Sequence, residues 1–545
     1  MSPVEVGRLE GDALEVLLLI RTIKNNFAPI NRIPLELLSQ IPRYWGENCM
    51  EKNLIAMTHV CRSWRKIFTG YSSLWTHLTF THLEKTRVYL QRSKSSLLDI
   101  DLQDDGGPHH LKDALLLIVP HISRVSSVNI CGEDDLLRDF TRYFSCPVPF
   151  LKHLSIDLSA GPPPILNDAL FAGDVSSLRT LCLSGITPHL PWKNLQNLTT
   201  FLLRGISQTE TSVTRLLDIF ENAPRLGEVE MYSIPSSSDA PARRVVSLSC
   251  LKSFVLLTDL TRSSILLDHL CIPAGASLHL EFDFDGGESP LPGALPKAPE
   301  NLQNITHITS AYIRLDDADL SIRLTGPSGE LLIYGYQEDW SSVMTEYTDQ
   351  IFHSLDYFPL SRIQKLAVTY EPSTAETINK SSPGYILNAM KDLRTLFINE
   401  CNHTSFILAL NPNDSPSKRV LCPKLENLIL HLEERVSLDI GVLILMVKER
   451  ASKGAELRSI TVTGRGEFGP EEEVRELSEY VAVEYRSEED RSEWDSIPEI
   501  GNQLLTDVRA FTLLLVPLCL ISRPRTGRSS AMHHSYRTWL PSEMV

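Results

Sequence analysis

A six-residue hydrophobic pattern recurs through most of this chain. It reads hydrophobic-x-x-hydrophobic-x-hydrophobic, and clear copies begin at Leu97, Val125, Leu151, Leu178, Leu198, Leu226, Leu251, Leu331, Ile363, Leu393, Leu425 and Leu457. Two weaker copies begin at Gly275 and Ile305. The mean spacing is about 28 residues, a period typical of repeat architectures.

Each copy predicts one short strand. Side chains alternate between the two faces of a strand, so the last two hydrophobic residues of a copy point into a core and those between them point outward. One repeat cannot bury its apolar face alone, whereas stacked neighbours share a continuous core. Segments between the copies carry apolar residues at helical spacing and predict covering helices at Ser212 to Ala223, Ser341 to Phe358 and Ser437 to Ala451.

This array, residues 97–466, resembles leucine-rich-repeat proteins. The resemblance implies an α+β/solenoid fold class, with a small all-α module followed by an irregular α/β horseshoe whose concave face carries parallel strands. Loops rich in Pro, Gly, Ser and Asn interrupt the array at 235–243, 285–301, 371–384 and 411–423. These loops are either contact segments for a bound protein or ordinary surface variation.

Helical patterns precede the array. In the leader, residues 1–29, an amphipathic pattern predicts a helix from Gly11 to Asn25. This helix packs on the next module, mediates self-association, or is a frayed leader. A connecting helix, Leu83 to Ser93, is predicted within 81–96, and it should join the module to the array rigidly because a flexible Gly/Ser linker is absent.

The module at 30–80 contains two predicted helices. Ile33 and Pro34 open the first helix, which Pro42 ends near Ile41. After a polar stretch, a second pattern runs from Leu54 to Phe68. So small a module buries little apolar surface on its own, so the neighbouring domain or a partner should cover the remainder.

Three motifs of the module match a known pattern in order and spacing. They are Ile33-Pro34-Leu35-Glu36-Leu37-Leu38, Val60-Cys61-Arg62-Ser63-Trp64 and Leu74-Trp75. The module thereby resembles an F-box, and the run Ile41 to Trp45 is similar to F-boxes common in mushroom-forming (basidiomycete) fungi. Pro42 departs from the general pattern, since many F-boxes continue their first helix there.

The F-box resemblance implies docking on a Skp-type adaptor and, through it, on a cullin of a ubiquitin ligase. The adaptor-binding residues that it implies are Ile33, Pro34, Leu35, Leu38, Ile41, Val60, Cys61, Trp64, Leu74 and Trp75. The repeat array would then hold a client protein. The chain itself would not be the catalyst.

The last part of the chain does not continue the repeat. Residues 467–500 are charged and predict an acidic cap with a short helix and a strand from Val481 to Tyr485. Residues 501–545 are irregular, and their Arg/Ser-rich end is typical of a disordered tail.

Composition excludes several functions. The net charge of −16 argues against nucleic-acid binding, which favours a basic footprint. The 10 cysteines form no Cys-x-x-Cys pair, so we expect no zinc site and no cofactor, and the thiols are typical of a reduced, cytoplasmic or nuclear protein. The longest apolar run, Ala510 to Ile521, is shorter than a membrane span, so no membrane association is expected.

No catalytic motif is present. The sequence lacks a phosphate-binding Gly-rich loop, a nucleophile elbow and a His-Glu-x-x-His zinc motif. Asp283 and Asp285 precede two glycines, but the remaining ligands of a calcium loop are missing, so a turn is the better interpretation. We therefore expect a binding protein, not an enzyme.

The outward positions of the predicted strands form the expected binding surface. Exposed apolar residues beside charged ones are typical of protein recognition. The client-binding candidates are Leu202, Arg204, Tyr232, Val255, Phe397 and Ile429. Alternatively, terminal helices or loops cover this face. The functional alternative to a ligase receptor is a repeat-array scaffold whose F-box acts outside a ubiquitin ligase.

Overall fold

The structure of the chain is a computed structural model. It describes residues 2–41, 47–80, 82–103, 108–132, 140–158, 166, 170–187, 193–205, 212–232, 239–241, 243–258, 260–283, 294–315, 319–336, 355–370, 382–399, 403–413, 419–432, 438–464 and 468–486. The predicted tail, most of the Ser341 to Phe358 helix, and Pro42 to Trp45 lie outside these residues.

The N-terminal part is helical. Its elements are α1 (Pro3–Asn26), η1 (Pro29–Arg32), α2 (Leu35–Gln40), α3 (Glu47–Thr58), α4 (Arg62–Gly70), η3 (Ser72–Leu74) and α5 (Leu83–Ser93). The leader helix is longer than predicted, because Pro3 starts it and Ser2 and Glu5 form a capping box. The predicted connecting helix is confirmed as α5.

One predicted helix of the module is two helices. The pattern from Leu54 to Phe68 reads as continuous, but the chain leaves helical geometry between α3 and α4. Cys61 is extended, with φ −159°, and its Sγ accepts a hydrogen bond from the Trp64 amide. Cys61 therefore caps α4, and its side chain replaces an intrahelical acceptor.

A 17-stranded, mostly parallel sheet follows. Its strands are β1 (His77–Thr79), β2 (Leu98–Gln103), β3 (Val125–Gly132), β4 (His153–Leu158), β5 (Thr180–Ser184), β6 (Thr200–Arg204), β7 (Glu228–Tyr232), β9 (Ser253–Leu257), β11 (Ser277–Asp283), β12 (Ser310–Leu315), β13 (Asp319–Gly326), β14 (Gly329–Tyr336), β15 (Lys365–Tyr370), β16 (Thr395–Asn399), β17 (Asn427–Leu432), β18 (Ser459–Gly464) and β19 (Ala482–Arg486). Two short strands, β8 (Val246–Ser247) and β10 (Leu270–Cys271), pair separately.

The predicted strands are confirmed. Every copy of the hydrophobic pattern coincides with a strand or leads directly into one, and β19 matches the strand expected in the cap. In β4, Leu154, Ile156 and Leu158 are buried, whereas the residues between them are more exposed, as alternation requires. Neighbouring copies pair in register, for example Leu154 with Leu181 of β5.

The order of strands differs from the prediction at one place. Strands β12, β13 and β14 form an antiparallel meander within the parallel ladder, so β11 pairs with β14, and β12 pairs with β15. The turn between β13 and β14 requires Gly329, whose φ is +136°. The copies at Ile305 and Leu331 therefore mark two arms of one meander, not successive parallel repeats.

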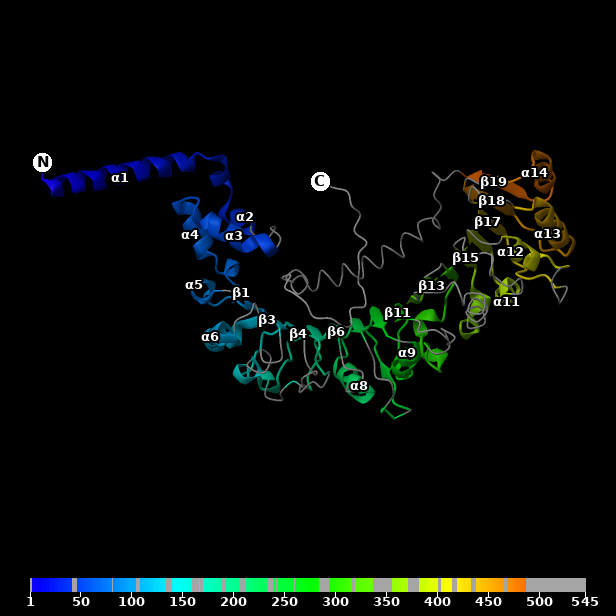
Figure 1. Cartoon of the computed structure of the whole chain (residues 1–545), viewed down its shortest axis with the longest axis horizontal. Helices are drawn as coiled ribbons and strands as arrows, with labels where there is room; N and C mark the ends of the chain where they lie inside the picture. Colours follow the sequence, from blue (N-terminus) through cyan, green and yellow to red (C-terminus); the bar gives the residue numbers. More distant parts are fainter. Residues whose placement is uncertain are drawn as a thin grey trace, which may run out of the picture. The chain divides into compact units, whose positions relative to one another are not determined.

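Helices lie along one side of the sheet (Figure 1). They are α6 (Pro108–Ile118), α8 (Val213–Asn222), α9 (Leu260–Leu267), α11 (Ser382–Ala389), α12 (His403–Leu410), α13 (Ile440–Ser452) and α14 (Glu471–Ser478). The short helices are η4 (Val119–Arg124), η5 (Leu170–Gly173), η6 (Pro299–Asn301), η7 (Gln303–Ile305), η8 (Leu355–Tyr357) and η9 (Leu360–Arg362). The expected covering helices at 212–223 and 437–451 are confirmed as α8 and α13.

Candidate functional site

Four of the expected adaptor-binding residues lie inside the N-terminal module. Leu38, Trp64, Leu74 and Trp75 are between 1% and 7% exposed. The Trp64 Nε1–H donates to Asn31 Oδ1 at 2.5 Å, and the Trp75 Nε1–H donates to the Phe68 carbonyl at 2.8 Å. These four side chains belong to the core of the module in this structure.

The remaining expected residues lie nearer the surface. Pro34 and Val60 are exposed, and Ile33, Ile41 and Cys61 are half-buried against the core. The side chain of Leu35 is outside the described part of the structure.

Three exposed large apolar residues of the module were not among the expected contacts, the first being Ile30, which is 45% exposed. The other two are Leu37, which is 54% exposed, and Ile55, which is 39% exposed. Their apolar character gave no means of telling them from their buried neighbours Leu38 and Leu54. Leu37 and Ile55, with the exposed Pro34 and Val60, are apolar residues that the module leaves in contact with water.

The module is joined to the sheet by hydrogen bonds and packing. Strand β1 pairs in parallel with β2, placing Leu78 opposite Ile100. The ring of Trp75 meets the ring of Tyr89 in α5 edge-on at 4.9 Å between centroids, and the Arg92 guanidinium lies 4.3 Å from the Trp75 ring. The connection is thus structured through α5, as the missing flexible linker predicts.

The face of the sheet away from the helices carries side chains in continuous rows, here called the outward face. The register of each strand pair aligns one residue per strand in a middle row. This row runs Asp101, Asn129, Ser155, Cys182, Leu202, Glu230, Val255, His279, Leu332, Arg323, Tyr312, Ala367, Phe397, Ile429, Thr461 and Glu484.

Three expected client contacts in the middle row are buried, contrary to their predicted exposure. Leu202, Val255 and Phe397 are 3%, 8% and 4% exposed, and Ile429 is half-buried. Each has a row neighbour on both sides at the spacing of paired strands, which contributes to its burial. Most of the apolar side chains in the middle row are therefore shielded from solvent.

Arg204 and Tyr232 lie two residues beyond the middle row, toward the carboxyl ends of their strands, and are half-buried. Arg204 Nη2 is 2.5 Å from Glu230 Oε1, and its guanidinium lies 4.8 Å from the centroid of the Tyr232 ring. Burial and the charge of Glu230 raise the pKa of Tyr232 well above its usual range. The phenol therefore stays neutral and offers a stacking surface and a hydrogen-bonding hydroxyl.

His279 occupies the centre of the outward face, between Val255 and Leu332. Burial lowers the pKa of its imidazole to about 4. No residue hydrogen-bonds to its Nε2 atom in the described part of the chain. His279 is therefore a neutral, polar group within an otherwise apolar stretch of the row.

The residues contributed by the meander were missed by sequence reasoning. Leu332, Arg323 and Tyr312 fall in the middle row because β12, β13 and β14 form the meander. His279 of β11, next to the meander, was missed as well. The signal was present in Gly326-Pro327-Ser328-Gly329, a turn sequence between two alternating strands. Arg323 also forms an ion pair with Glu330 across this hairpin.

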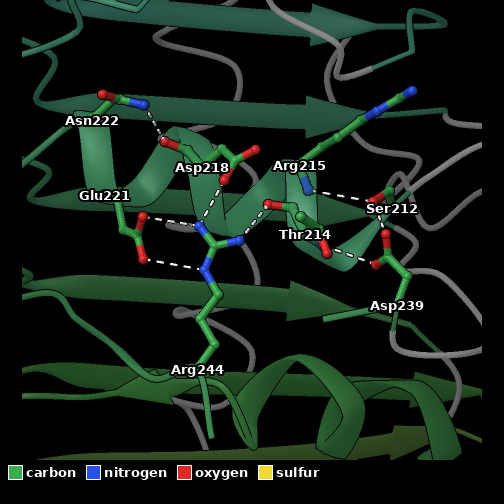
Figure 2. Close-up of polar contacts among 8 residues, drawn as sticks. All are labelled: Ser212, Thr214, Arg215, Asp218, Glu221, Asn222, Asp239 and Arg244. Carbon is green, nitrogen blue, oxygen red and sulfur yellow. Dashed lines mark hydrogen bonds and ion pairs between the residues drawn. The ribbon is translucent and has the colours of Figure 1, made fainter. Parts of the chain in front are cut away.

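A polar network holds a connecting segment against α8 (Figure 2). Arg244 Nη2 lies 2.6 Å from Asp218 Oδ1 and 2.9 Å from Glu221 Oε2, both on α8. Asp239 accepts hydrogen bonds from the Thr214 amide, at 2.9 Å, and from the Ser212 hydroxyl. Although partial burial acts to raise the pKa of Asp239, these hydrogen bonds hold it below its usual range.

The polar groups of this network stabilise the position of α8. Its acids pair with Arg244, whose pKa rises through hydrogen bonds to Glu221 and Asp218, or they cap the start of α8. The Ser212 hydroxyl, which donates to Asp239, also accepts from the Arg215 amide as the N-cap of α8, and the eight residues of the network include no His or Lys that could act as its base. The network therefore fixes the helix layer.

The described residues hold no arrangement that we recognise as a reactive centre. They contain no group of three or more His, Cys, Asp or Glu side chains that could bind a metal ion. Burial raises the pKa of Cys182, on the outward face, to about 12, so its thiol is not an activated nucleophile. Among the described helices none is long and apolar enough to cross a membrane.

Comparison with known proteins adds no assignment. No family model matches the chain, and no curated protein matches its sequence.

Proposed function

We propose that this chain is the substrate-recognition subunit of a Skp–cullin–F-box ubiquitin ligase. Residues 30–80 act as the F-box and bind a Skp-type adaptor, and the sheet with its helices acts as an irregular, leucine-rich-repeat-like solenoid that binds a client protein. The observation that carries the proposal is the ordered set of three motifs in a helical module that pairs directly with the sheet.

The exposed apolar side chains of the module indicate where an adaptor would bind. Of the apolar residues in the module, Leu37 and Val60 are 54% and 59% exposed, and both belong to the F-box-like motifs. Covering them would remove apolar surface from water, which is the main driving force for association. Trp64 and Trp75 support this surface from within.

The outward face of the sheet is the surface that would bind a client. Its middle row is largely closed around Leu202 and Val255, whereas the next row offers the half-buried side chains of Arg204, Tyr232 and Leu257. Tyrosine and arginine are enriched where proteins bind one another, because they combine apolar contact area with hydrogen bonding. A client therefore meets Arg204 and Tyr232 before any of the buried apolar residues.

Co-purification with a Skp-type adaptor tests the first half of the proposal. Wild-type chain should bind the adaptor, and Leu37→Glu with Val60→Glu should abolish binding because two charges would be desolvated at the interface. Leu116→Glu changes an apolar residue of α6 that is 49% exposed outside the module, so it serves as the matched control and should bind normally.

Two results would refute this assignment. One is wild-type chain that fails to bind the adaptor, which would favour the scaffold alternative. The other is a double variant that binds as well as wild type. The double variant must also show the wild-type thermal melting curve, so that loss of binding is not loss of folding.

Client capture tests the second half. Affinity purification with mass spectrometry, under proteasome inhibition, should recover proteins with wild type that are depleted with Tyr232→Ala plus Leu257→Ala. Leu116→Glu again provides the control. If all three chains recover the same proteins in equal amounts, the outward face is not the client site. That result would not affect the adaptor assignment.

A further inference from the structure

The leader helix α1 presents apolar residues to solvent along its length. Val6, Leu9, Val16, Ile20 and Ile23 are between 39% and 57% exposed. An isolated helix in water gains little stability from its own hydrogen bonds, and most helices in proteins are stabilised by packing of an apolar face. The exposed face of α1 is therefore a surface that a partner would stabilise.

The spacing of these residues identifies the geometry of that partner. One set of apolar residues follows at intervals of three, four, three, four, three and four along α1 and its C-cap: Val6, Leu9, Ala13, Val16, Ile20, Ile23 and Phe27. Leu14, Leu17 and Leu19 are also exposed but fall outside this set. This is the 3.5-residue period of the a and d positions of a coiled coil. At 1.5 Å per residue, α1 is about 36 Å long, which accommodates three heptads.

The charges beside the seam identify the orientation. In a parallel pair, Glu5 at a g position would face Glu10 of the other helix at an e position, a repulsive contact. In an antiparallel pair, e positions face e positions and g positions face g positions. Two Glu10–Lys24 attractions then accompany a single Asp12–Asp12 contact at the two-fold axis, whereas the parallel pair has two Glu5–Glu10 repulsions and no opposite-charge pair. Full overlap of the two helices then sets Val6 against Ile23 and Leu9 against Ile20.

We propose that α1 pairs with α1 of a second copy of this chain as an antiparallel two-stranded coiled coil. The seam is Val6, Leu9, Ala13, Val16, Ile20 and Ile23, and two Glu10–Lys24 pairs flank it. The opposed helix dipoles of an antiparallel pair add a further favourable term. This inference does not depend on the ligase assignment.

Solution mass of the full chain tests the pairing. Wild type should sediment at about twice its chain mass of 61.3 kDa at micromolar concentrations. Val16→Glu with Ile20→Glu should weaken dimerisation roughly 100-fold or more, because both glutamates would be desolvated in the seam. Leu14→Glu with Thr22→Glu adds the same charges outside the seam and should remain dimeric.

A wild-type chain that stays monomeric at tens of micromolar would overturn the proposal, as would a dimer that survives Val16→Glu with Ile20→Glu. Adaptor binding should be the same for all these chains. Self-association and the ligase assignment therefore fail or succeed separately.

A charge exchange tests the orientation. Glu10→Lys alone and Lys24→Glu alone should each weaken the dimer roughly 5-fold, and the two changes together should restore wild-type affinity. In a parallel dimer, Glu10→Lys would instead relieve the contact with Glu5 and strengthen association. Strengthening by Glu10→Lys would therefore rule out the antiparallel arrangement.

Discussion

At the scale of single residues, two buried polar side chains affect the stability of the chain in different ways. His279 and Arg450 are 6% and 0% exposed. Arg450 donates from Nη1 to the Leu421 carbonyl at 2.8 Å and from Nη2 to the Cys422 carbonyl at 2.9 Å. His279 Nε2, in contrast, has no such acceptor or donor among the described residues. One side chain thus stabilises the fold through hydrogen bonds, and the other makes stability depend on pH.

His279 should lower stability in mild acid. Its folded pKa of about 4 lies below the ordinary value of 6.5, so the unfolded chain binds a proton first as pH falls. Its contribution is full above pH 6.5 and declines toward pH 4, reaching a loss of about 3 kcal/mol.

His279→Leu should remove that dependence. Between pH 7 and pH 5, urea unfolding of the variant should lose about 2 kcal/mol less than wild type. Leucine also suits the row between Val255 and Leu332. Identical pH dependence in the two chains would show that His279 is not buried as a neutral group.

Arg450→Met should destabilise the chain by about 2–4 kcal/mol, because two buried carbonyls would lose their donors. Lys448→Met is the matched control on the same helix, since Lys448 pairs with Glu476 at the surface and should matter much less. Urea denaturation measures both variants. Equal effects would indicate that Arg450 is not the link between α13 and the segment before β17.

At the scale of elements, sequence pattern predicted strands better than their direction. Alternation in copies such as Leu151 to Ile156 correctly placed buried and outward side chains, because burial is a local property of a strand. Alternation is the same for parallel and antiparallel strands, so the direction of β13 had to come from turn chemistry. The α3–α4 break likewise depends on the extended backbone of Cys61, which hydrophobic spacing does not encode.

The sheet face on which the candidate client-binding residues lie was predicted correctly, but their exposure was not. The register of β6 and β7 places Leu202 beside Glu230 on the expected face. Exposure depends on what packs beside a residue from strands distant in sequence, and a single hydrophobic pattern carries no such information. The same limit explains why Trp64 and Leu37, both in matching motifs, have opposite exposure.

The stability of the first turn of helix α8 can be tested through Asp239. Asp239→Ala should expose the start of α8, because the Thr214 amide and the Ser212 hydroxyl lose their acceptor. Hydrogen exchange at the Thr214 amide should accelerate, while the Arg450 region, on a different helix, should be unchanged. Unaltered exchange at Thr214 would contradict the role of Asp239 as a cap.

At the scale of the whole molecule, the module and the sheet are one packing unit at their junction. Trp75 contacts Tyr89, and Leu78 pairs with Ile100, so the core of the module continues past residue 80. A fragment of residues 30–80 would expose Trp75 and Leu78, both 1% exposed in the chain.

The isolated 30–80 fragment should therefore lack a cooperative thermal transition. A fragment of residues 30–158, which keeps α5 and strands β1 to β4, should unfold cooperatively. Circular dichroism melting measures both. A cooperative melt of the shorter fragment would show that the module folds independently of the sheet.

The middle row of the outward face also has a fixed spacing between side chains, which an extended ligand would have to match. Neighbouring strands are about 4.8 Å apart, whereas an extended peptide advances about 3.3 Å per residue. Three peptide residues, about 9.9 Å, thus span nearly the same length as two strand steps, about 9.6 Å. Side chains of an extended peptide alternate between its two faces, so residues three apart point in opposite directions. The same face returns over a strand only after six residues, about 19.8 Å, and four strand steps, about 19.2 Å, so the binding motif of an extended client segment lying along the row would repeat with a period of six.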